Sequence, residues 1–136
     1  MSIKYKFRHS LRVRFAEVDK HGHVFNAHYL TYFDTAITEY LRHLNILGDP
    51  QFDKLFFLVK RVEIDYQASV YFDQLIHVYV VIEKIGKTSV MFNLEIFSDN
   101  NKDKLALGKV VWVCVDPKLR QKILIPKWFR QHFIDE

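Results

Sequence analysis

The chain has 136 residues, a formal charge of +4 and an apolar fraction of 49%. This length and composition suit one packed domain over residues 1–136 and exclude a disordered chain. No apolar run approaches the ~20 residues of a membrane-spanning helix, and the N-terminus has no apolar signal-peptide core. Cys114 is the single cysteine, so we expect no internal disulfide and a reducing, cytoplasmic setting.

The excess of basic residues is mild and spread along the chain. A nucleic-acid-binding protein would more often concentrate its basic residues in one stripe. The nearest approach to a stripe consists of Lys4, Lys6, Arg8, Arg12 and Arg14. We interpret this group as a solvated strand face and expect no nucleic-acid partner.

Hydrophobic periodicity predicts the elements in chain order. Apolar and basic residues alternate near residues 7–16, which predicts a first strand. From Leu30 onward, apolar residues recur every three or four positions, which predicts a helix of about four to five turns. Asn26 is the expected N-cap, and Gly48 and Pro50 are expected to end this helix.

The period then changes to two. This change predicts four strands, at residues 58–66, 75–84, 89–98 and 105–115. Turn-like residues at 85–87 and 99–101 suggest antiparallel hairpins, and residues 127–133 suggest a short terminal helix.

Five strands and one long helix predict an α+β fold, in which a curved antiparallel sheet wraps around the helix. Several strands carry apolar residues on both faces, and one helix cannot cover both faces of a sheet. We therefore expect the second face to pack against another subunit.

The loop before the long helix concentrates the chemically active residues. Residues 19–29 hold one carboxylate, one glycine and three histidines. A carboxylate beside a helix start can do chemistry, because the free N–H groups there stabilise developing negative charge. The alternative is that Asp19 only caps a turn, which is the commonest role of a loop aspartate.

Residues 15–30 resemble the 4-hydroxybenzoyl-CoA thioesterase-like branch of the hotdog-fold thioesterases. The family pattern Asp-x-x-Gly-x-Val is matched by Asp19, Gly22 and Val24, and the family's Tyr-Leu pair is matched by Tyr29 and Leu30. Similar segments follow in the family order at residues 33–41, 62–66 and 85–89. The resemblance spans nearly the whole chain, and the order and spacing of its pieces make it specific.

The resemblance implies a hotdog fold and the hydrolysis of an acyl-CoA thioester, with no cofactor. It implies that Asp19 is the catalytic carboxylate, acting as nucleophile or as general base on water. The backbone N–H near Asn26 would polarise the thioester carbonyl. His23 would tune or position Asp19, and the alternative is an ordinary loop histidine.

The resemblance also suggests which residues bind the substrate. Val24, Phe25 and Tyr29 would contact it near the helix start, although packing, with its hydroxyl satisfied nearby, explains Tyr29 better. The CoA phosphates or pantetheine would meet a second group, which consists of Lys84, Lys87, Thr88 and Ser89. The alternative for this group is a plain hairpin with a solvated lysine. A homodimer or homotetramer is the expected assembly.

Departures from the family pattern leave other functions open. Short-chain acyl-CoA members often have His in place of Asn26 and Asn in place of His28, and residues 22–26 resemble a run in acyl-carrier-protein thioesterases. Hydrolysis of acyl-carrier protein is therefore one alternative, and a non-catalytic acyl-binding scaffold is another. A hotdog dehydratase or hydratase fits the histidine and carboxylate spacing less well. Asp34 and Glu39 could form a second acid pair, but a polar helix face explains them better.

Other motifs are weaker. The loop carboxylate and histidines could bind a metal, but no complementary ligands are evident elsewhere, so we expect no metal. Residues 86–88 lack the earlier glycine of a phosphate loop, because Val81 occupies that position. Cys114 lies in an apolar strand without an activating partner, so we expect a small buried side chain.

Overall fold

The computed structural model describes residues 5–133. Its strands and helices in chain order are β1 (Arg8–Arg12), α1 (His28–His43), β2 (Phe56–Tyr66), β3 (Leu75–Ile85), β4 (Ser89–Ser98), β5 (Lys104–Val115) and α2 (Lys127–Gln131). Two short 3₁₀ turns, η1 (Phe15–Glu17) and η2 (Phe52–Lys54), complete the elements. Within the described chain, no helix is long and apolar enough to cross a membrane.

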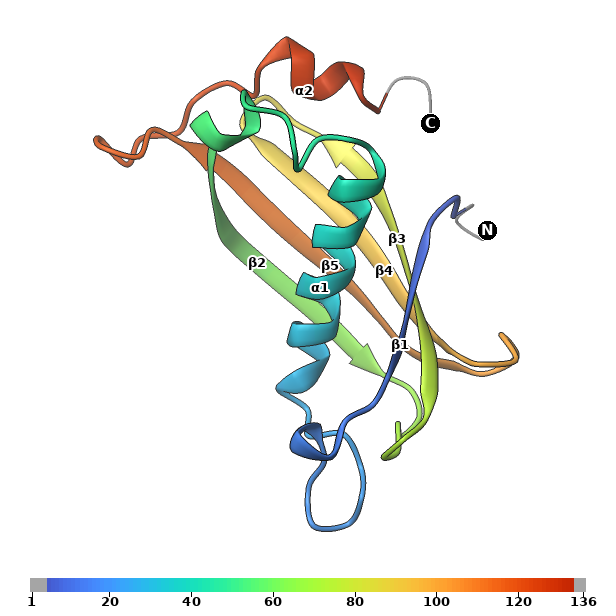
Figure 1. Ribbon diagram of the computed structural model, residues 1–136. Helices are drawn as coiled ribbons and strands as arrows, with labels where there is room; N and C mark the ends of the chain where they lie inside the picture. The colour runs from blue at the N-terminus through green and yellow to red at the C-terminus, as the bar shows by residue number, and fades with distance from the viewer. Residues whose placement is uncertain (1–4, 134–136) are drawn as a thin grey trace.

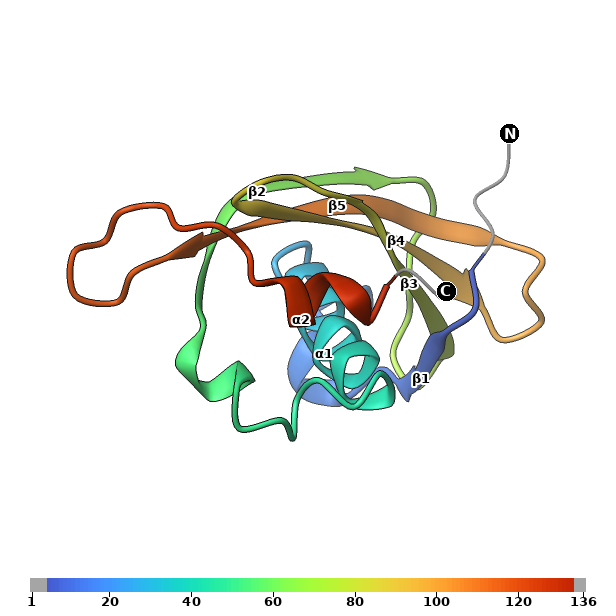
Figure 2. The same cartoon turned by 90° about the horizontal axis from the view of Figure 1, so that it is seen from above.

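The strands form one antiparallel sheet in the order β1-β3-β4-β5-β2. The sheet curves around α1, as Figures 1 and 2 show from two directions. This architecture confirms the predicted α+β fold. The β3–β4 and β4–β5 pairs are hairpins, as expected, but β2 pairs with β5 rather than with the next strand, β3. The chain therefore crosses the sheet between β2 and β3.

The core lies between α1 and the inner face of the sheet. The apolar stripe of α1 buries Phe33, Ile37 and Leu41, as its three-to-four-residue period predicts. A side chain of α1 packs directly on Gly108 of β5, where a Cβ atom would collide with the Phe33 ring and would lie 2.8 Å from the Glu63 carbonyl oxygen. Only glycine fits there, because the aromatic ring fills the space of a side chain.

The predicted ends of α1 are wrong at both termini. Ala27 rather than Asn26 is the N-cap, and no side chain caps the first turn. At the other end the helix ends at His43, before Gly48, because Asn45 adopts a left-handed φ of 61°. The Asn45 N–H donates to the Arg42 carbonyl at 3.0 Å and the Ile46 N–H donates to the Leu41 carbonyl at 3.0 Å. These two bonds form a Schellman motif, in which asparagine replaces the more common glycine.

The first strand is shorter than predicted. β1 ends at Arg12, and residues that continue its alternating pattern instead form the 3₁₀ turn η1. The strand pattern breaks because Glu17 folds back to Arg14 and accepts hydrogen bonds from its backbone N–H (2.9 Å) and its Nε (2.6 Å).

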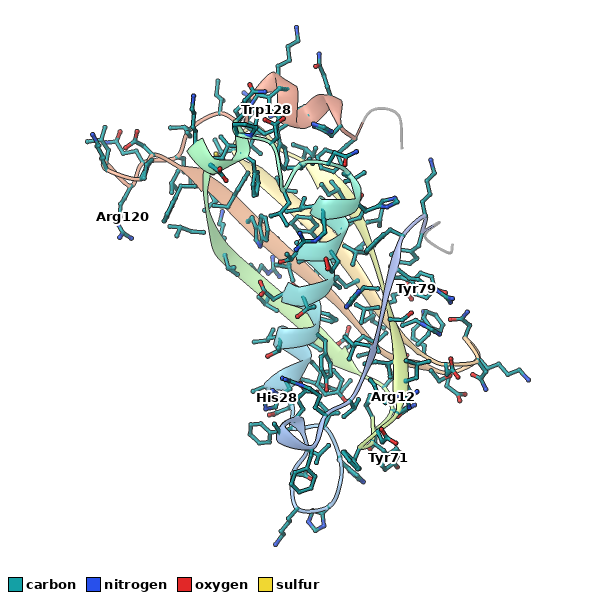
Figure 3. The ribbon with its side chains drawn as sticks, in the orientation of Figure 1. Arg12, His28, Tyr71, Tyr79, Arg120 and Trp128 are labelled. Atoms are coloured by element: carbon teal, nitrogen blue, oxygen red, sulfur yellow. The ribbon has the colours of Figure 1, made fainter. Side chains whose placement is uncertain are left out.

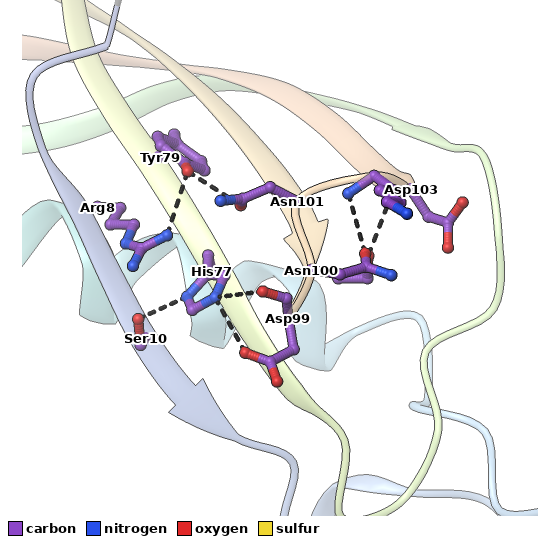
Figure 4. Close-up of polar contacts among 10 residues, drawn as sticks. Arg8, Ser10, His77, Tyr79, Asp99, Asn100, Asn101 and Asp103 are labelled. Atoms are coloured by element: carbon purple, nitrogen blue, oxygen red, sulfur yellow. Dashed lines mark hydrogen bonds and ion pairs between the residues drawn. The ribbon is translucent and has the colours of Figure 1, made fainter.

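A buried histidine of β3 links β1 to the turn between β4 and β5 (Figure 4). His77 of β3 is only 5% exposed. Its Nδ1 lies 2.6 Å from Ser10 Oγ of β1, and its Nε2 lies 3.1 Å from the Asp99 carbonyl oxygen in the β4–β5 turn. The imidazole therefore links three segments that are distant in the sequence.

The two edges of the sheet differ. The β1 edge has five residues and carries Arg8 and Arg12, a short, charged form that discourages further strand pairing. The β2 edge has 11 residues. It exposes apolar side chains, namely Phe56, Val59, Val62 and Tyr66. A long apolar edge of this kind is a template for pairing with another strand.

The contact at Gly108 yields a stability prediction. Gly108→Ala should lower the free energy of unfolding by about 1–3 kcal/mol, because the Phe33 ring and the β2 backbone would have to move. Urea denaturation measures this change. The matched control is Gly48→Ala, since a Cβ atom at Gly48 meets nothing within 4 Å. Equal effects of the two substitutions would contradict the proposed close packing.

Candidate functional site

The loop between η1 and α1 is a tight, hydrogen-bonded turn. The Asp19 N–H donates to the His23 carbonyl at 2.8 Å, and the Gly22 N–H donates to the Asp19 carbonyl at 3.0 Å. Gly22 has a φ of +80°, a conformation that side chains disfavour. The family-pattern glycine is therefore required by the backbone, because it reverses the chain and holds Asp19 at the start of the turn.

The Asp19 carboxylate is exposed and held by the backbone. Its Oδ1 accepts hydrogen bonds from the N–H groups of His21 (2.9 Å) and His23 (3.2 Å). Desolvation acts to raise the pKa of Asp19, but the two N–H donors and the nearby imidazoles outweigh it, so the pKa lies below its ordinary value. The carboxylate is ionised at neutral pH, which is the form that a nucleophile or a general base requires.

Unpaired backbone donors lie between this turn and α1. Among residues 5–133, no acceptor is found for the backbone N–H of Asn26 or of Ala27. The Asn26 carbonyl accepts a hydrogen bond from Tyr66 Oη of β2 at 3.2 Å, and the ring of Tyr66 contacts buried Tyr29 at 4.8 Å between centroids. Two free N–H groups at a helix start can stabilise an oxyanion.

Glu17, which the sequence interpretation missed, anchors the loop. This carboxylate is buried, with 4% exposure, and accepts a hydrogen bond from Tyr32 Oη of α1 at 2.9 Å. Burial acts to raise its pKa, but Arg14 and Tyr32 outweigh burial and hold the pKa of Glu17 below 4.5. The Glu17 carbonyl also accepts the Phe25 N–H at 2.9 Å. The i, i+3 pair of Arg14 and Glu17 was the available sequence signal.

The remaining predicted loop residues have different environments. His23 is half-buried and its ring contacts the Tyr71 ring at 4.8 Å, so it packs on the crossover before β3. Val24 is buried in the core, and its N–H donates to the Val70 carbonyl. Phe25 is half exposed, beside the ring of His28. The structure therefore brings Phe25 and Tyr29 to the helix start with Asn26, whereas Val24 supports the loop from inside.

The predicted CoA-binding residues lie far from Asp19 in the same chain. Lys84, Lys87, Thr88 and Ser89 belong to the β3–β4 hairpin, which lies near α2 at the opposite end of α1 (Figure 1). The Lys87 carbonyl accepts the Ile125 N–H at 2.9 Å, and the Gly86 carbonyl accepts Arg130 Nη2 at 2.6 Å. One chain does not bring the two predicted groups together.

The described residues also form hollows outside the loop. An apolar pocket of about 390 Å³ lies at the start of β2, lined by Asp34, Phe52, Leu55, Phe56, Phe57, Val59 and Trp112. A wider groove of about 820 Å³ crosses the outer face of the sheet, among residues that include Tyr79, Asn93 and Glu95. The lining of neither hollow includes a residue of the Asp19 loop.

The other candidate residues, Cys114 and Glu39, have structural roles. Cys114 is buried, as predicted, and burial raises the pKa of its thiol, which disfavours a nucleophilic thiolate. Glu39 pairs with Arg42 at 2.9 Å on the surface of α1. Within residues 5–133, no cluster of three or more histidine, cysteine or carboxylate side chains has a metal-binding arrangement.

Comparisons with known proteins identify the family of the chain. The family model of the thioesterase-like superfamily matches residues 13–133. The acyl-CoA thioester hydrolase YbgC of Escherichia coli is 29% identical over 122 residues, covering 89% of this chain and 90% of its own. The acyl-CoA thioesterase YbgC of Haemophilus influenzae is 30% identical over 129 residues, covering 93% of each chain.

Solved structures confirm the hotdog fold. A Pseudomonas aeruginosa protein superposes with a TM-score of 0.84 at 30% identity, covering 96% of this chain and 91% of its own. A 1,4-dihydroxy-2-naphthoyl-CoA thioesterase from Synechocystis superposes with a TM-score of 0.85 at 18% identity, covering 96% and 98%. The second likeness is one of fold alone.

The anchor at Glu17 predicts a pH-dependent contribution to stability. A lowered folded-state pKa stabilises the protein above the ordinary value of 4.5, and this contribution is lost as the pH falls through the folded-state pKa. Glu17→Gln should therefore lower the free energy of unfolding by about 1.5–3 kcal/mol at pH 7. The difference from wild type should shrink as the pH falls from 7 towards about 2.

Denaturant unfolding across this pH range tests the prediction. Glu39→Gln is the control, because an exposed ion pair contributes only about 0.5 kcal/mol. A Glu17→Gln deficit that did not change with pH would show that the carboxylate charge is not the anchor.

Proposed function

Because the chain belongs to the thioesterase-like superfamily, it is a thioester hydrolase, and we propose that its substrate is an acyl-CoA and that Asp19 drives the reaction. The observation that carries this proposal is the ionised Asp19 carboxylate, which lies in the same loop as the two unpaired N–H groups of Asn26 and Ala27. The names of the bacterial relatives support the choice of acyl-CoA as the substrate.

The reaction uses the loop as follows. The thioester carbonyl oxygen accepts a hydrogen bond from the Asn26 N–H, which stabilises the negative charge of the tetrahedral intermediate. Asp19 either attacks the carbonyl carbon or removes a proton from a water molecule that attacks it. Collapse of the intermediate breaks the C–S bond, and CoA leaves as a thiolate that takes up a proton. In the nucleophile route, water then hydrolyses the acyl–Asp19 anhydride.

A second copy of the chain completes the site. In one chain the apolar pocket adjoins Phe56 at the start of β2, whereas Tyr66 at the end of β2 contacts the Asn26 carbonyl. Two copies related by a two-fold axis pair the same edge antiparallel, so the start of one β2 meets the end of the other. We infer that the acyl group of a substrate at Asp19 enters the pocket of the second copy.

The carrier of the acyl group can be tested directly. The net charge of +4 would also suit an acidic acyl-carrier protein. Matched acyl-CoA and acyl-carrier-protein substrates with the same acyl chain separate these carriers. A higher kcat/KM for the carrier protein would replace CoA in the proposal, whereas binding without turnover of either substrate would favour an acyl-binding scaffold.

Asp19→Asn should lower kcat for acyl-CoA hydrolysis by at least about 1,000-fold, because the amide is neither a nucleophile nor a base. The measurement is thiol release, with circular dichroism as a check on folding. Asp103→Asn, an exposed carboxylate in the β4–β5 turn, is the control and should keep wild-type turnover. A folded Asp19→Asn enzyme with normal kcat would remove Asp19 from the mechanism.

A single turnover in ¹⁸O-labelled water tests the nucleophile role of Asp19. In the nucleophile route, water that attacks the aspartyl carbonyl of the anhydride leaves the label in the Asp19 carboxylate, and the released acid carries an original Asp19 oxygen instead. The general-base route places the label only in the released acid. Mass spectrometry of the peptide that contains Asp19 reads the result.

The proposed pairing predicts at least a dimer in sedimentation velocity. Val59→Asp combined with Val62→Asp should shift the protein towards the monomer, because the pairing would bury like charges beside one another. Phe15→Asp is the control, since Phe15 is 79% exposed and lies outside β2. A monomeric wild type would refute the shared site.

A further inference from the structure

An exposed serine, a buried imidazole and a carboxylate contact one another at the β1 edge of the sheet. Ser10 of β1 is exposed, and its Oγ lies 2.6 Å from Nδ1 of His77. Nε2 of the same ring lies 3.1 Å from the Asp99 carbonyl oxygen and 3.4 Å from Asp99 Oδ1. Figure 4 shows these contacts side by side. Serine hydrolases hold a hydroxyl, an imidazole and a carboxylate in the same order of contact.

The partners of the His77 ring fix the direction of its hydrogen bonds. Both Asp99 oxygens near Nε2 are acceptors, so Nε2 carries the proton of the neutral imidazole. Nδ1 is then an acceptor, and the Ser10 hydroxyl donates to it. The two ring nitrogens are exchanged relative to serine proteases, but the imidazole is still placed to remove the hydroxyl proton.

The backbone of β1 offers an oxyanion donor beside this hydroxyl. The Val80 N–H donates to the Phe7 carbonyl at 3.3 Å, and the Val13 N–H donates to the Gln74 carbonyl at 2.9 Å. Bonded positions alternate in an antiparallel pair, so these two bonds place the Ser10 N–H on the side of β1 away from β3. β1 is an edge strand, and no strand of residues 5–133 pairs on that side. The N–H is therefore available to a developing oxyanion, as a nucleophile's own N–H is in serine proteases.

A groove for a substrate begins next to the imidazole. Phe97 of β4 pairs with His77, and Tyr79 follows His77 on the same face of β3. Both aromatic residues line the outer-face groove of about 820 Å³, and their rings are in edge contact at 5.5 Å between centroids. An apolar group attached to a carbonyl at Ser10 can lie along these rings.

This site is separate from the Asp19 loop. Ile76 and Val78, the neighbours of His77 in β3, are buried in the core. Since side chains alternate along a strand, His77 belongs to the outer face, opposite α1. Figure 3 shows Tyr79 beside β1 and well above His28, the first residue of α1. The reaction proposed for Asp19 uses none of the groups at this edge.

We propose that Ser10 is the nucleophile of a second site, which hydrolyses carboxylic esters with a short apolar acyl group. His77 is its general base. Asp99 is a positioning residue, which orients the imidazole and stabilises its charged form. The aromatic end of the groove receives the acyl group. This activity is additional to thioester hydrolysis and does not depend on Asp19.

The proposed reaction has two steps. Ser10 Oγ attacks the ester carbonyl carbon, its proton passes to His77 Nδ1, and the Ser10 N–H binds the oxyanion. Collapse breaks the bond to the leaving oxygen, which takes the proton from Nδ1 and departs as an alcohol. Water then attacks the acyl–Ser10 ester and gives a proton to Nδ1. That proton returns to Ser10 Oγ as the carboxylic acid is released.

A fluorophosphonate probe tests whether Ser10 is activated. Attack of Oγ on phosphorus releases fluoride and leaves a stable phosphonate ester, a reaction that ordinary serines do not undergo at a useful rate. Peptide mass spectrometry of the wild type should find the phosphonate on Ser10. Ser69, which is exposed between β2 and β3, is the internal control and should stay unmodified.

Turnover of p-nitrophenyl acetate tests the whole site. The assay uses the Asp19→Asn background, so that the Asp19 loop cannot account for hydrolysis. Adding Ser10→Ala should lower kcat at least about 100-fold, whereas adding Ser69→Ala should leave it unchanged.

Two further variants test the groups behind Ser10. His77→Gln should abolish turnover, with circular dichroism as the check on folding because the ring is buried. Asp99→Asn keeps the backbone carbonyl at Nε2 and removes only an exposed charge. It should lower kcat about fivefold, leave KM unchanged and leave the unfolding temperature unchanged.

Three results would overturn the second site. They are a wild type without phosphonate on Ser10, equal modification of Ser69, and ester turnover that survives Ser10→Ala. An unchanged kcat of the Asp99→Asn variant would remove Asp99 from the site, even if His77→Gln did not fold. A wild type that hydrolyses p-nitrophenyl acetate but no acyl-CoA would defeat the proposed function of Asp19 and leave Ser10 in place.

Discussion

The buried carboxylate of Glu17 is the contact on which the candidate site depends. It accepts a hydrogen bond from Tyr32 of α1, which ties the segment after β1 to the helix. The backbone carbonyl of Glu17 also accepts the Phe25 N–H. A buried charge is tolerated only where hydrogen bonds replace its hydration, and Arg14 and Tyr32 supply them. The turn that carries Asp19 is thus fastened at both ends, so its exposed carboxylate has a defined place relative to α1.

The sheet adds a second constraint, because its two edges are unequal. β1 is short, charged and joined to its neighbours by the His77 imidazole. β2 is long, and its apolar side chains are exposed. Within one chain, the loop and the apolar pocket lie at different ends of β2. The free β2 edge separates the loop from the pocket within one chain. A second copy that paired with this edge would bring its own pocket beside the loop.

Periodicity predicted the regular elements well. β4 spans the predicted residues 89–98, and β3 differs from its prediction by one residue, since strands with a buried inner face show a clear period of two. The pairing of β2 with β5 could not be predicted, because it depends on where the chain crosses the sheet. The end of α1 was misplaced because Asn45 performs the turn for which Gly48 was the stronger sequence signal.

The site was only partly predictable for a similar reason. Asp19, Gly22 and Tyr29 belong to a recognisable spacing, whereas the importance of Glu17 arises from burial by α1, which no local pattern reveals. The hairpin at Lys87 was assigned to the same site as Asp19, yet one chain holds them apart. A linear motif contains no information about which copy contributes each piece.

The missing side-chain cap on α1 has a consequence for engineering this protein. Ala27 leaves the first turn without the oxygen that serine or aspartate would provide, at a cost of about 1 kcal/mol in helix stability. Serine or aspartate at position 27 is therefore the first substitution to make for a more stable protein. The added acceptor would bind the N–H of Tyr29 or Leu30 and leave the free N–H groups of Asn26 and Ala27 to the substrate, so this position can gain thermal stability without the loss of an oxyanion donor.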